Sequence, residues 1–265
     1  GQLGTGDTVT RGDEPGEMGD ALPRVETTTV IVGLTSMGSA NCVAGGATDD
    51  VMCWGANAKG QLARGDMETM LTPSFASTGF AVAVAGGLEH LCVVRTNATI
   101  RCVGANDSGQ LGIGSTSNIG DEPGEINGLP SVDLTHTATP TAMATGGYHS
   151  CFVLPDGGPR CIGDNQNGAL GYGDTTTRGS TADTVGNSLP YVDLGTGRTA
   201  VAVAAGFANT CAILDDGSLK CWGRNTEGIL GLGDINARGD QPGEMGDALP
   251  VVDLGTGRTA AEVAM

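Results

Sequence analysis

Short runs of small apolar residues recur along the chain and predict β-strands. Alternation of Val and Ala with a period of two is typical of a strand with one buried face. Because the side chains are small, we expect each run to be an inner strand, where neighbouring sheets converge. The predicted runs are Val30 to Val32, Ala81 to Ala85, Ala142 to Ala144, Val201 to Ala205 and Ala261 to Ala264.

A predicted β-hairpin follows each of the first four runs. In the last full copy the hairpin reads NTCAIL, DDG and SLKCWG over residues 209–223. A three-residue turn that ends in glycine fits a type I turn closed by a left-handed residue. With Leu214 and Ser218 on either side of the turn, equal steps outward place Cys211 opposite Cys221.

The eight cysteines form pairs 10 or 11 residues apart, one pair in each predicted hairpin. Directly opposed residues of two antiparallel strands have β-carbons about 4.5–5.5 Å apart, close to the separation that a disulfide needs. We therefore predict four disulfides, which imply an extracellular, cell-surface or periplasmic location. Free thiols with a cytoplasmic location, or a metal site, are the alternatives, although the chain lacks the close C-x-x-C pairs of zinc sites. The predicted pairs are Cys42 and Cys53, Cys92 and Cys102, Cys151 and Cys161, and Cys211 and Cys221.

A glycine-rich block follows the second cysteine of each hairpin and marks the chain as a repeat array. The block reads CWGRNTEGILGLGD from Cys221 to Asp234, and three further copies begin at Cys53, Cys102 and Cys161. The first glycine of each G-x-L block recurs every 49 to 60 residues. A period near 50 with strand-like content predicts a β-propeller, so we treat residues 1–265 as a single array. The repeat markers are Gly1, Gly60, Gly109, Gly168 and Gly228.

The motif C-W-G-x-N-x-x-G-x-L-G-x-G-D, preceded by A-V-A-A-G and a hairpin with D-D-G, resembles the repeat of the regulator of chromosome condensation family (RCC1-like). The resemblance covers nearly the whole chain and implies a seven-bladed propeller with four antiparallel strands in each blade. The 265 residues hold about four and a half repeats, so we expect a piece of a longer propeller. A five-bladed ring with one incomplete blade is the alternative, but it leaves open sheet edges.

The charge of the chain disfavours two classes of partner. Thirty acidic and thirteen basic side chains give a formal net charge of −17, which repels nucleic-acid backbones and anionic membranes. No run of 18 apolar residues predicts a membrane span. With only two Trp, three Tyr and four Phe, the chain also offers few aromatic rings for stacking on sugars.

Acidic loops are the candidate partner-binding sites. The sequence RGDEPGEMGDALP at Arg11 to Pro23 returns as RGDQPGEMGDALP at Arg238 to Pro250, and Gly120 to Pro130 is a weaker copy. Loops that vary on a repeated scaffold are where binding differences usually reside, so we expect a protein partner with a basic surface. Calcium bound by the carboxylates is the weaker alternative, because the spacing matches no EF-hand. The candidates are Asp13, Glu14, Glu17, Asp20, Asp121, Glu122, Glu125, Asp240, Glu244 and Asp247.

No residue pattern indicates catalysis or a cofactor. His90 and His149 each precede a cysteine by two residues, and Asn209 and Ala40 hold the same register elsewhere, so we interpret them as structural. His136 is solitary in a Thr-rich loop. The glycine blocks lack the lysine and the helix of a phosphate-binding loop. The repeated asparagines are interpreted as turn residues that bind local backbone: Asn57, Asn106, Asn165 and Asn225.

The tripeptide Arg11-Gly12-Asp13 resembles an integrin ligand, but it lies in a repeated loop and recurs at residues 238–240, so we interpret it as a coincidence. The leading hypothesis is therefore a non-enzymatic interaction scaffold. The resemblance also implies guanine-nucleotide exchange on a small GTPase, an activity of the family's nuclear founder. That activity is the alternative function, although no insertion beyond the regular period is present.

Overall fold

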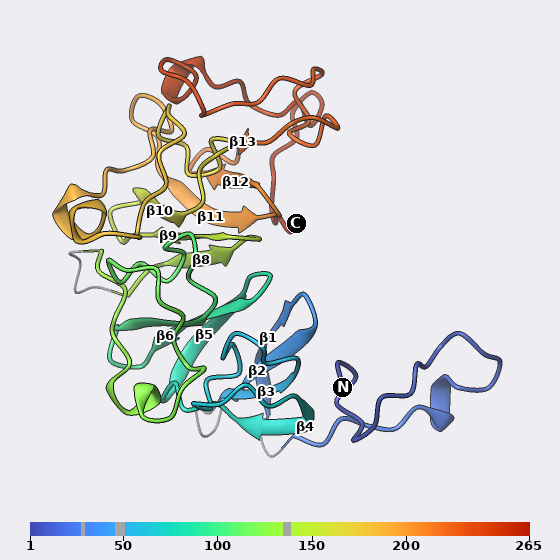
Figure 1. The fold of residues 1–265 in the computed structure, drawn as a ribbon. Helices are drawn as coiled ribbons and strands as arrows, with labels where there is room; N and C mark the ends of the chain where they lie inside the picture. The colour runs from blue at the N-terminus through green and yellow to red at the C-terminus, as the bar shows by residue number, and fades with distance from the viewer. Residues whose placement is uncertain (28–29, 46–50, 135–138) are drawn as a thin grey trace.

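The chain forms antiparallel β-sheets joined by long glycine-rich loops, as seen in a computed structural model (Figure 1). The structure describes residues 1–27, 30–45, 51–134 and 139–265. Within these residues, all regular structure is β-strand apart from five short 3-10 helices, which confirms the all-β prediction. The helices are η1 (Gly19–Ala21), η2 (Glu125–Gly128), η3 (Ala182–Thr184), η4 (Gly186–Ser188) and η5 (Gly246–Ala248).

Four sheets follow one another in chain order (Figure 1). The first contains β1 (Ile31–Met37), β2 (Ala40–Gly45), β3 (Val51–Gly55) and β4 (Met70–Phe75). The second contains β5 (Ala81–Gly86), β6 (His90–Arg95) and β7 (Ile100–Gly104). The third contains β8 (Ala142–Thr145), β9 (His149–Val153) and β10 (Pro159–Gly163). The fourth contains β11 (Ala200–Ala205), β12 (Asn209–Leu214) and β13 (Leu219–Gly223).

The first strand of each sheet faces a shared hollow. β1, β5, β8 and β11 contact one another in that order. Residues of all four strands line one groove, among them Ser36, Gly86, Thr145 and Ala204. Small side chains allow the strands to approach closely, as the alternating runs predicted. Sheets arranged about a common axis in this way are the blades of a β-propeller.

The predicted strand at Ala261 to Ala264 is not a strand in the structure. A strand needs a neighbour with which to exchange backbone hydrogen bonds, and no described strand pairs with this segment. The segment nevertheless contacts the last blade, because Val263 packs against the cluster that contains Leu230. It therefore lies at the inner edge without forming a ladder.

Only the first of the four described sheets has the fourth strand that the family resemblance implies. In the other three, the returning chain meets the third strand at one antiparallel bridge, for example between Gly163 and Arg178. In these three blades the outer strand is therefore reduced to a single bridge. The bond from the repeated asparagine to the turn is present in blades of both kinds, at 2.8 Å from Asn165 Nδ2 to the carbonyl oxygen of Asp174 and at 2.7 Å from Asn57 Nδ2 to that of Asp66.

The hairpin register places each cysteine directly opposite its partner. Cys211 pairs with Cys221 in the ladder, and the N–H of Leu214 donates to the carbonyl of Ser218 across the turn. Gly217 has a φ of +78°, so it supplies the left-handed residue that this turn requires. All four disulfides join residues whose Cα atoms are 4.1 Å apart: Cys42–Cys53, Cys92–Cys102, Cys151–Cys161 and Cys211–Cys221. The extra turn residue of the first hairpin lies outside the described residues.

The leucines of four G-x-L blocks, Leu62, Leu111, Leu170 and Leu230, are fully buried, whereas Leu3 of the first block is 44% exposed. The two tryptophans tie blades together, because each indole N–H donates to a carbonyl of the preceding G-x-L turn. Trp222 Nε1 lies 3.0 Å from the oxygen of Ala169, and Trp54 Nε1 lies 2.8 Å from that of Gln2. Both side chains are buried, as expected for a packing role.

Candidate functional site

The acidic loops are positioned by the turn of the preceding blade. The N–H of Gly173 donates to the carbonyl oxygen of Gly239 at 3.0 Å, and two other loops make the equivalent bond at 3.0 and 3.1 Å. The contact is so close that a Cβ on Gly168 would lie 2.4 Å from the backbone nitrogen of Asp240. Glycine is therefore required on the turn side of the contact.

Each receiving turn is held in shape by its repeated asparagine. In the last copy, the side-chain oxygen Oδ1 of Asn225 accepts from the N–H of Leu230 at 2.9 Å, and the side-chain Nδ2 donates to the backbone carbonyl of Asp234 at 3.0 Å. The four asparagines are at most 1% exposed. The interpretation of these asparagines as turn residues is confirmed.

In each acidic loop, here called a rim loop, one side chain accepts hydrogen bonds from the loop's own backbone. Glu17 accepts hydrogen bonds from two backbone N–H groups of its loop at 2.8 and 3.1 Å. Glu125 and Glu244 make the same pair of bonds in their loops, and Thr184 makes it in the equivalent loop at residues 178–190, all within 2.8–3.2 Å. The bonds, above all that from the Glu14 N–H, lower the pKa of Glu17. These three candidate glutamates thus stabilise the loops with at least one carboxylate oxygen.

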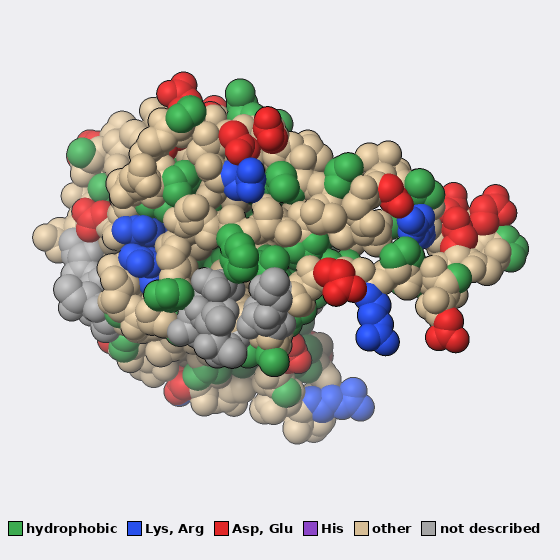
Figure 2. All heavy atoms as spheres, turned by 90° about the horizontal axis from the view of Figure 1, so that it is seen from below, with side chains coloured by type: hydrophobic (Ala, Val, Ile, Leu, Met, Phe, Trp, Pro, Cys, Tyr) green, Lys and Arg blue, Asp and Glu red, His purple; other side chains and the backbone are tan. Residues whose placement is uncertain are grey.

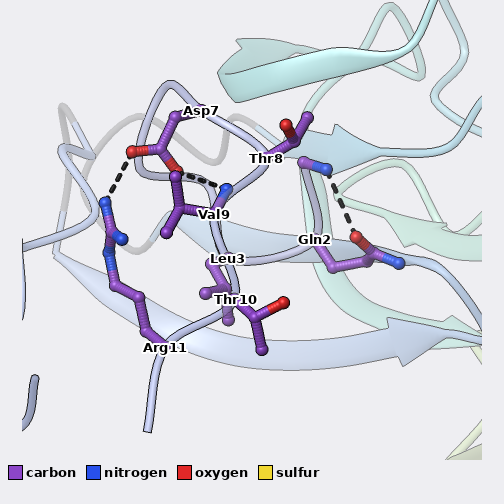
Figure 3. Close-up of a pocket in the computed structure, with 8 residues that line it drawn as sticks. Gln2, Leu3, Asp7, Thr8, Val9, Thr10 and Arg11 are labelled. Carbon is purple, nitrogen blue, oxygen red and sulfur yellow. Dashed lines mark hydrogen bonds and ion pairs between the residues drawn. The ribbon is translucent and has the colours of Figure 1, made fainter. Parts of the chain in front are cut away.

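An ion pair closes the entry to three of the loops. Arg11 Nη2 lies 2.5 Å from Asp7 Oδ2, and the pair is drawn in Figure 3. In the equivalent pair of a later repeat, Arg178 Nη2 lies 2.7 Å from Asp174 Oδ2. Arg238 and Asp234 form the third pair at 2.6 Å. The pairing with Arg178 is the main cause of the lowered pKa of Asp174. The arginine of the integrin-like tripeptide is therefore paired with the turn that precedes its loop.

Two buried basic side chains, Lys220 and Arg160, each hold a loop against its blade, and the sequence pattern did not predict this role. Lys220 Nζ donates to the carbonyls of Leu194 and Gly246 at 3.0 and 2.8 Å. Arg160, in the same register before the second cysteine, donates to the equivalent carbonyls at 2.9 and 3.1 Å. Burial lowers the pKa of Lys220, and the nearby Asp247 opposes that effect. A basic residue beside a buried cysteine was the available signal.

The remaining candidate carboxylates differ in their availability to a partner. Asp121 and Asp240 are half-buried at the start of docked loops. Asp247 is exposed, but its carboxylate accepts from the backbone N–H and the hydroxyl of Thr196, which lowers its pKa. Figure 2 shows acidic side chains along the arm formed by the first loop. The exposed candidates are Asp13, Glu14, Asp20, Glu122 and Asp247.

Two histidines lie between blades rather than in a cleft. His90 Nε2 is 3.0 Å from the hydroxyl of Ser150, and His149 Nε2 is 2.9 Å from that of Thr210. Both rings are buried, and burial lowers the pKa of His90 to about 3 and that of His149 to about 4. His136 lies outside the described residues.

The described residues contain no group of three or more His, Cys, Asp or Glu side chains arranged to hold a metal ion. No helix in the described part of the chain is long and apolar enough to cross a membrane.

Comparison with known proteins identifies the repeat. Residues 102–153 and 200–229 match family models described as "Regulator of chromosome condensation (RCC1) repeat". The ultraviolet-B receptor UVR8 of Arabidopsis thaliana is 31% identical over 210 residues, which cover 77% of this chain and 44% of the receptor. This chain therefore spans less than half the length of that relative.

Two solved structures share the fold. Human WBSCR16 superposes with a TM-score of 0.65 at 17% identity, over 89% of this chain and 62% of that one. Prp20p from Saccharomyces cerevisiae, described with its binding properties to Gsp1p and histones, superposes with a TM-score of 0.55 at 19% identity, over 73% and 43%. Both the repeat and the arrangement of its blades agree with these relatives, and the chain is an RCC1-like repeat protein with a β-propeller fold.

Proposed function

We propose that this protein is a non-enzymatic scaffold whose acidic rim loops bind a protein with a basic surface. The proposal rests on one observation: each of these loops has a glutamate that is hydrogen-bonded to the loop backbone, and two of them also carry acidic side chains exposed to solvent. Glu17, Glu125 and Glu244 hold the loop backbone, while Asp13, Glu14 and Glu122 remain exposed on it. A rigid loop loses little conformational entropy when it binds, so its carboxylates favour a complementary basic surface.

The described binding of Prp20p to histones is consistent with a basic partner for this fold. Core histones are therefore a suitable basic probe for the loops. Binding should weaken as ionic strength rises, because exposed charges are screened.

Neutralising the loop carboxylates tests the proposal. The variant Asp13→Asn, Glu14→Gln, Glu122→Gln preserves loop shape, since Gln241 naturally occupies the register of both glutamates. The control Glu68→Gln, Asp107→Asn, Glu262→Gln removes the same charge from exposed positions outside the loops. We expect the loop variant to lose affinity for histones and the control to keep it, measured by biolayer interferometry at two salt concentrations. Equal losses would show attraction by net charge alone and refute the role of the loops.

A nucleotide-release assay with the same purified protein tests the exchange-factor alternative. If substoichiometric amounts of this protein release labelled nucleotide from a small GTPase, the exchange-factor function is favoured over the scaffold function. Calcium in the loops is distinguished by titration: saturable binding of Ca²⁺ that the loop variant loses would reassign the carboxylates as ligands.

We also propose that the protein works in an oxidising compartment. Four cysteine pairs at bonding distance support this, since such bonds persist where thiols are not kept reduced. Mass spectrometry of the unreduced protein, isolated under alkylating conditions, should show four linked peptide pairs. If all eight cysteines are instead found alkylated, the cytoplasmic location is favoured.

A further inference from the structure

Two arginines of the second sheet, Arg95 and Arg101, lie next to each other on one face of that sheet. Arg101 of β7 pairs directly with Val93 of β6, and Arg95 lies two residues beyond Val93 on the same strand. Directly opposed residues, and residues two apart on one strand, point to the same face of a sheet. The two side chains are therefore diagonal neighbours.

Arg95 takes the place of a core leucine. It follows the first cysteine of its hairpin by three residues, and the third and fourth sheets have Leu154 and Leu214 in this register, each 1% exposed. The guanidinium group of Arg95 lies against the connector before β5, because a Cβ on Gly79 would lie 2.5 Å from Arg95 Nη2. A glycine at this place in the connector therefore makes room for the charged group.

Arg101 lacks the acceptors that its counterparts have. Arg160 and Lys220, in the same register, each donate to two loop carbonyls. The connector that carries the first carbonyl runs over residues 193–199 before β11, but only over residues 77–80 before β5. The rim loop that carries the second is one residue shorter in this blade, with EINGLP in place of EMGDALP. The second blade thus lacks the equivalent stretches of chain.

The two arginines form a positive site without a counter-ion among the described residues. Their Nε atoms are buried and have no hydrogen-bond acceptor there, whereas their terminal nitrogens remain open to solvent. Burial, and the charge of Arg95, lower the pKa of Arg101. At Lys220, in contrast, the carboxylates of Asp247 and Asp193 oppose the effect of burial on the pKa. The charge that is compensated in the fourth blade is not compensated in the second.

The second blade lies between two complete neighbours. Its inner strand β5 contacts β1 on one side and β8 on the other. Figure 1 shows the second sheet between the first and the third. The uncompensated charge therefore arises from the short connectors of this blade.

We propose that Arg95 and Arg101 bind a phosphate group, carried either by the free ion or by a small monoester. Two guanidinium groups match the charge of a phosphate monoester, about −1.5 to −2 at neutral pH. Each guanidinium can donate paired hydrogen bonds to the oxygens of such an anion. The ligand is small, because the net charge of −17 repels a long polyanion. The site is separate from the rim loops, so the proposal does not depend on the function proposed above.

The residue after Gly79 offers an apolar contact beside the two charges. Phe80 is 57% exposed, and its carbonyl oxygen accepts from the N–H of Thr96, the residue after Arg95. An aromatic ring that stays in solvent next to a cationic site suits the organic part of a monoester. Phenyl phosphate is therefore a suitable second probe.

Isothermal titration calorimetry of the full chain with sodium phosphate, in a chloride buffer, measures the binding. We expect saturable binding at a single site. Arg95→Leu and Arg101→Met introduce the residues that Leu154 and Met52 supply in the same registers, so both variants should fold. Each should weaken binding by roughly tenfold or more, because charge-assisted hydrogen bonds are lost. Arg258→Leu, at an exposed site far along the chain, is the control and should bind like the parent.

The two sources of phosphate are distinguished by the second probe. Tighter binding of phenyl phosphate than of phosphate, with the difference lost in Phe80→Ser, identifies a monoester, and equal affinity identifies the free ion. Thermal unfolding without ligand checks that each variant is folded. A parent that shows no saturable binding of either probe would overturn the proposal. Variants of Arg95 and Arg101 that bind like the parent, or acetate bound as tightly as phosphate, would also overturn it.

Discussion

The buried histidines should make the protein lose stability as the pH falls from neutral to mildly acidic. Ser150 uses its one hydroxyl proton to bind the carbonyl of Gln110 at 2.9 Å, so His90 Nε2 is the donor in their contact. The other ring nitrogen, Nδ1, has no hydrogen-bond partner among the described residues. Adding a proton there would create a charge in a fully buried ring, and this burial, with a smaller contribution from the charge of the nearby His149, lowers the pKa.

The size of the effect follows from linkage. The folded pKa values are about 3 for His90 and about 4 for His149, below the ordinary value of 6.5. Between those values the unfolded chain binds more protons than the folded one, so stability is complete above pH 6.5 and falls as the pH falls towards 4. At pH 5, each histidine favours the unfolded state by about 2 kcal/mol relative to pH 8. Two such groups remove about 4 kcal/mol, a large part of a typical domain's stability of about 5–15 kcal/mol.

The assay is chemical denaturation at pH 8 and pH 5 at constant ionic strength, with the variant His90→Asn, His149→Asn as the comparison. The chain itself places Asn209 in this register, so the substitution suits the site. We expect the parent to lose about 4 kcal/mol and the variant to lose little, because most carboxylates titrate below pH 5. His136 remains in both proteins and cancels. A parent that loses less than about 1 kcal/mol, or a variant that loses as much as the parent, would refute the reasoning.

Three further perturbations address the scaffold of the loops. Replacing Cys211 and Cys221 by serine opens a small loop and should lower the free energy of unfolding by about 2.5–3 kcal/mol in denaturant titrations, whereas an unchanged midpoint would contradict the stabilising role of the bridge. Asn225→Ala removes the bonds that shape the last turn and should cost about 1–3 kcal/mol, while Asn127→Ala, at an exposed site, is the control that should cost almost nothing. Lys220→Met leaves the carbonyls of Leu194 and Gly246 without their donor and should cost about 1–3 kcal/mol by thermal or chemical unfolding, and a neutral result would show that water replaces the ammonium group.

Local pattern alone was sufficient for the hairpins. The position of the Gly217 turn sets the register, and the register brings Cys211 to Cys221, since successive pairs in a ladder follow in fixed steps. The role of the repeated asparagine could also be predicted from local sequence, because the hydrogen-bond partners of Asn225 are Leu230 and Asp234, 5 and 9 residues further along the chain. The sequence by itself thus determined the repeat, the strands of the blades and the shape of the receiving turns.

Tertiary structure decided what the loops and the histidines do. Gly173 meets Gly239, and His90 meets Ser150, only because neighbouring blades approach each other, and residues so far apart share no local periodicity. The same is true of the outer strand, which pairs as a strand in the first sheet and as single bridges in the others. The charge of a loop can be read from its residues, but whether Glu17 faces a partner or its own backbone depends on the folded path of the chain. That path is fixed by packing between blades, which a residue pattern within one repeat does not specify.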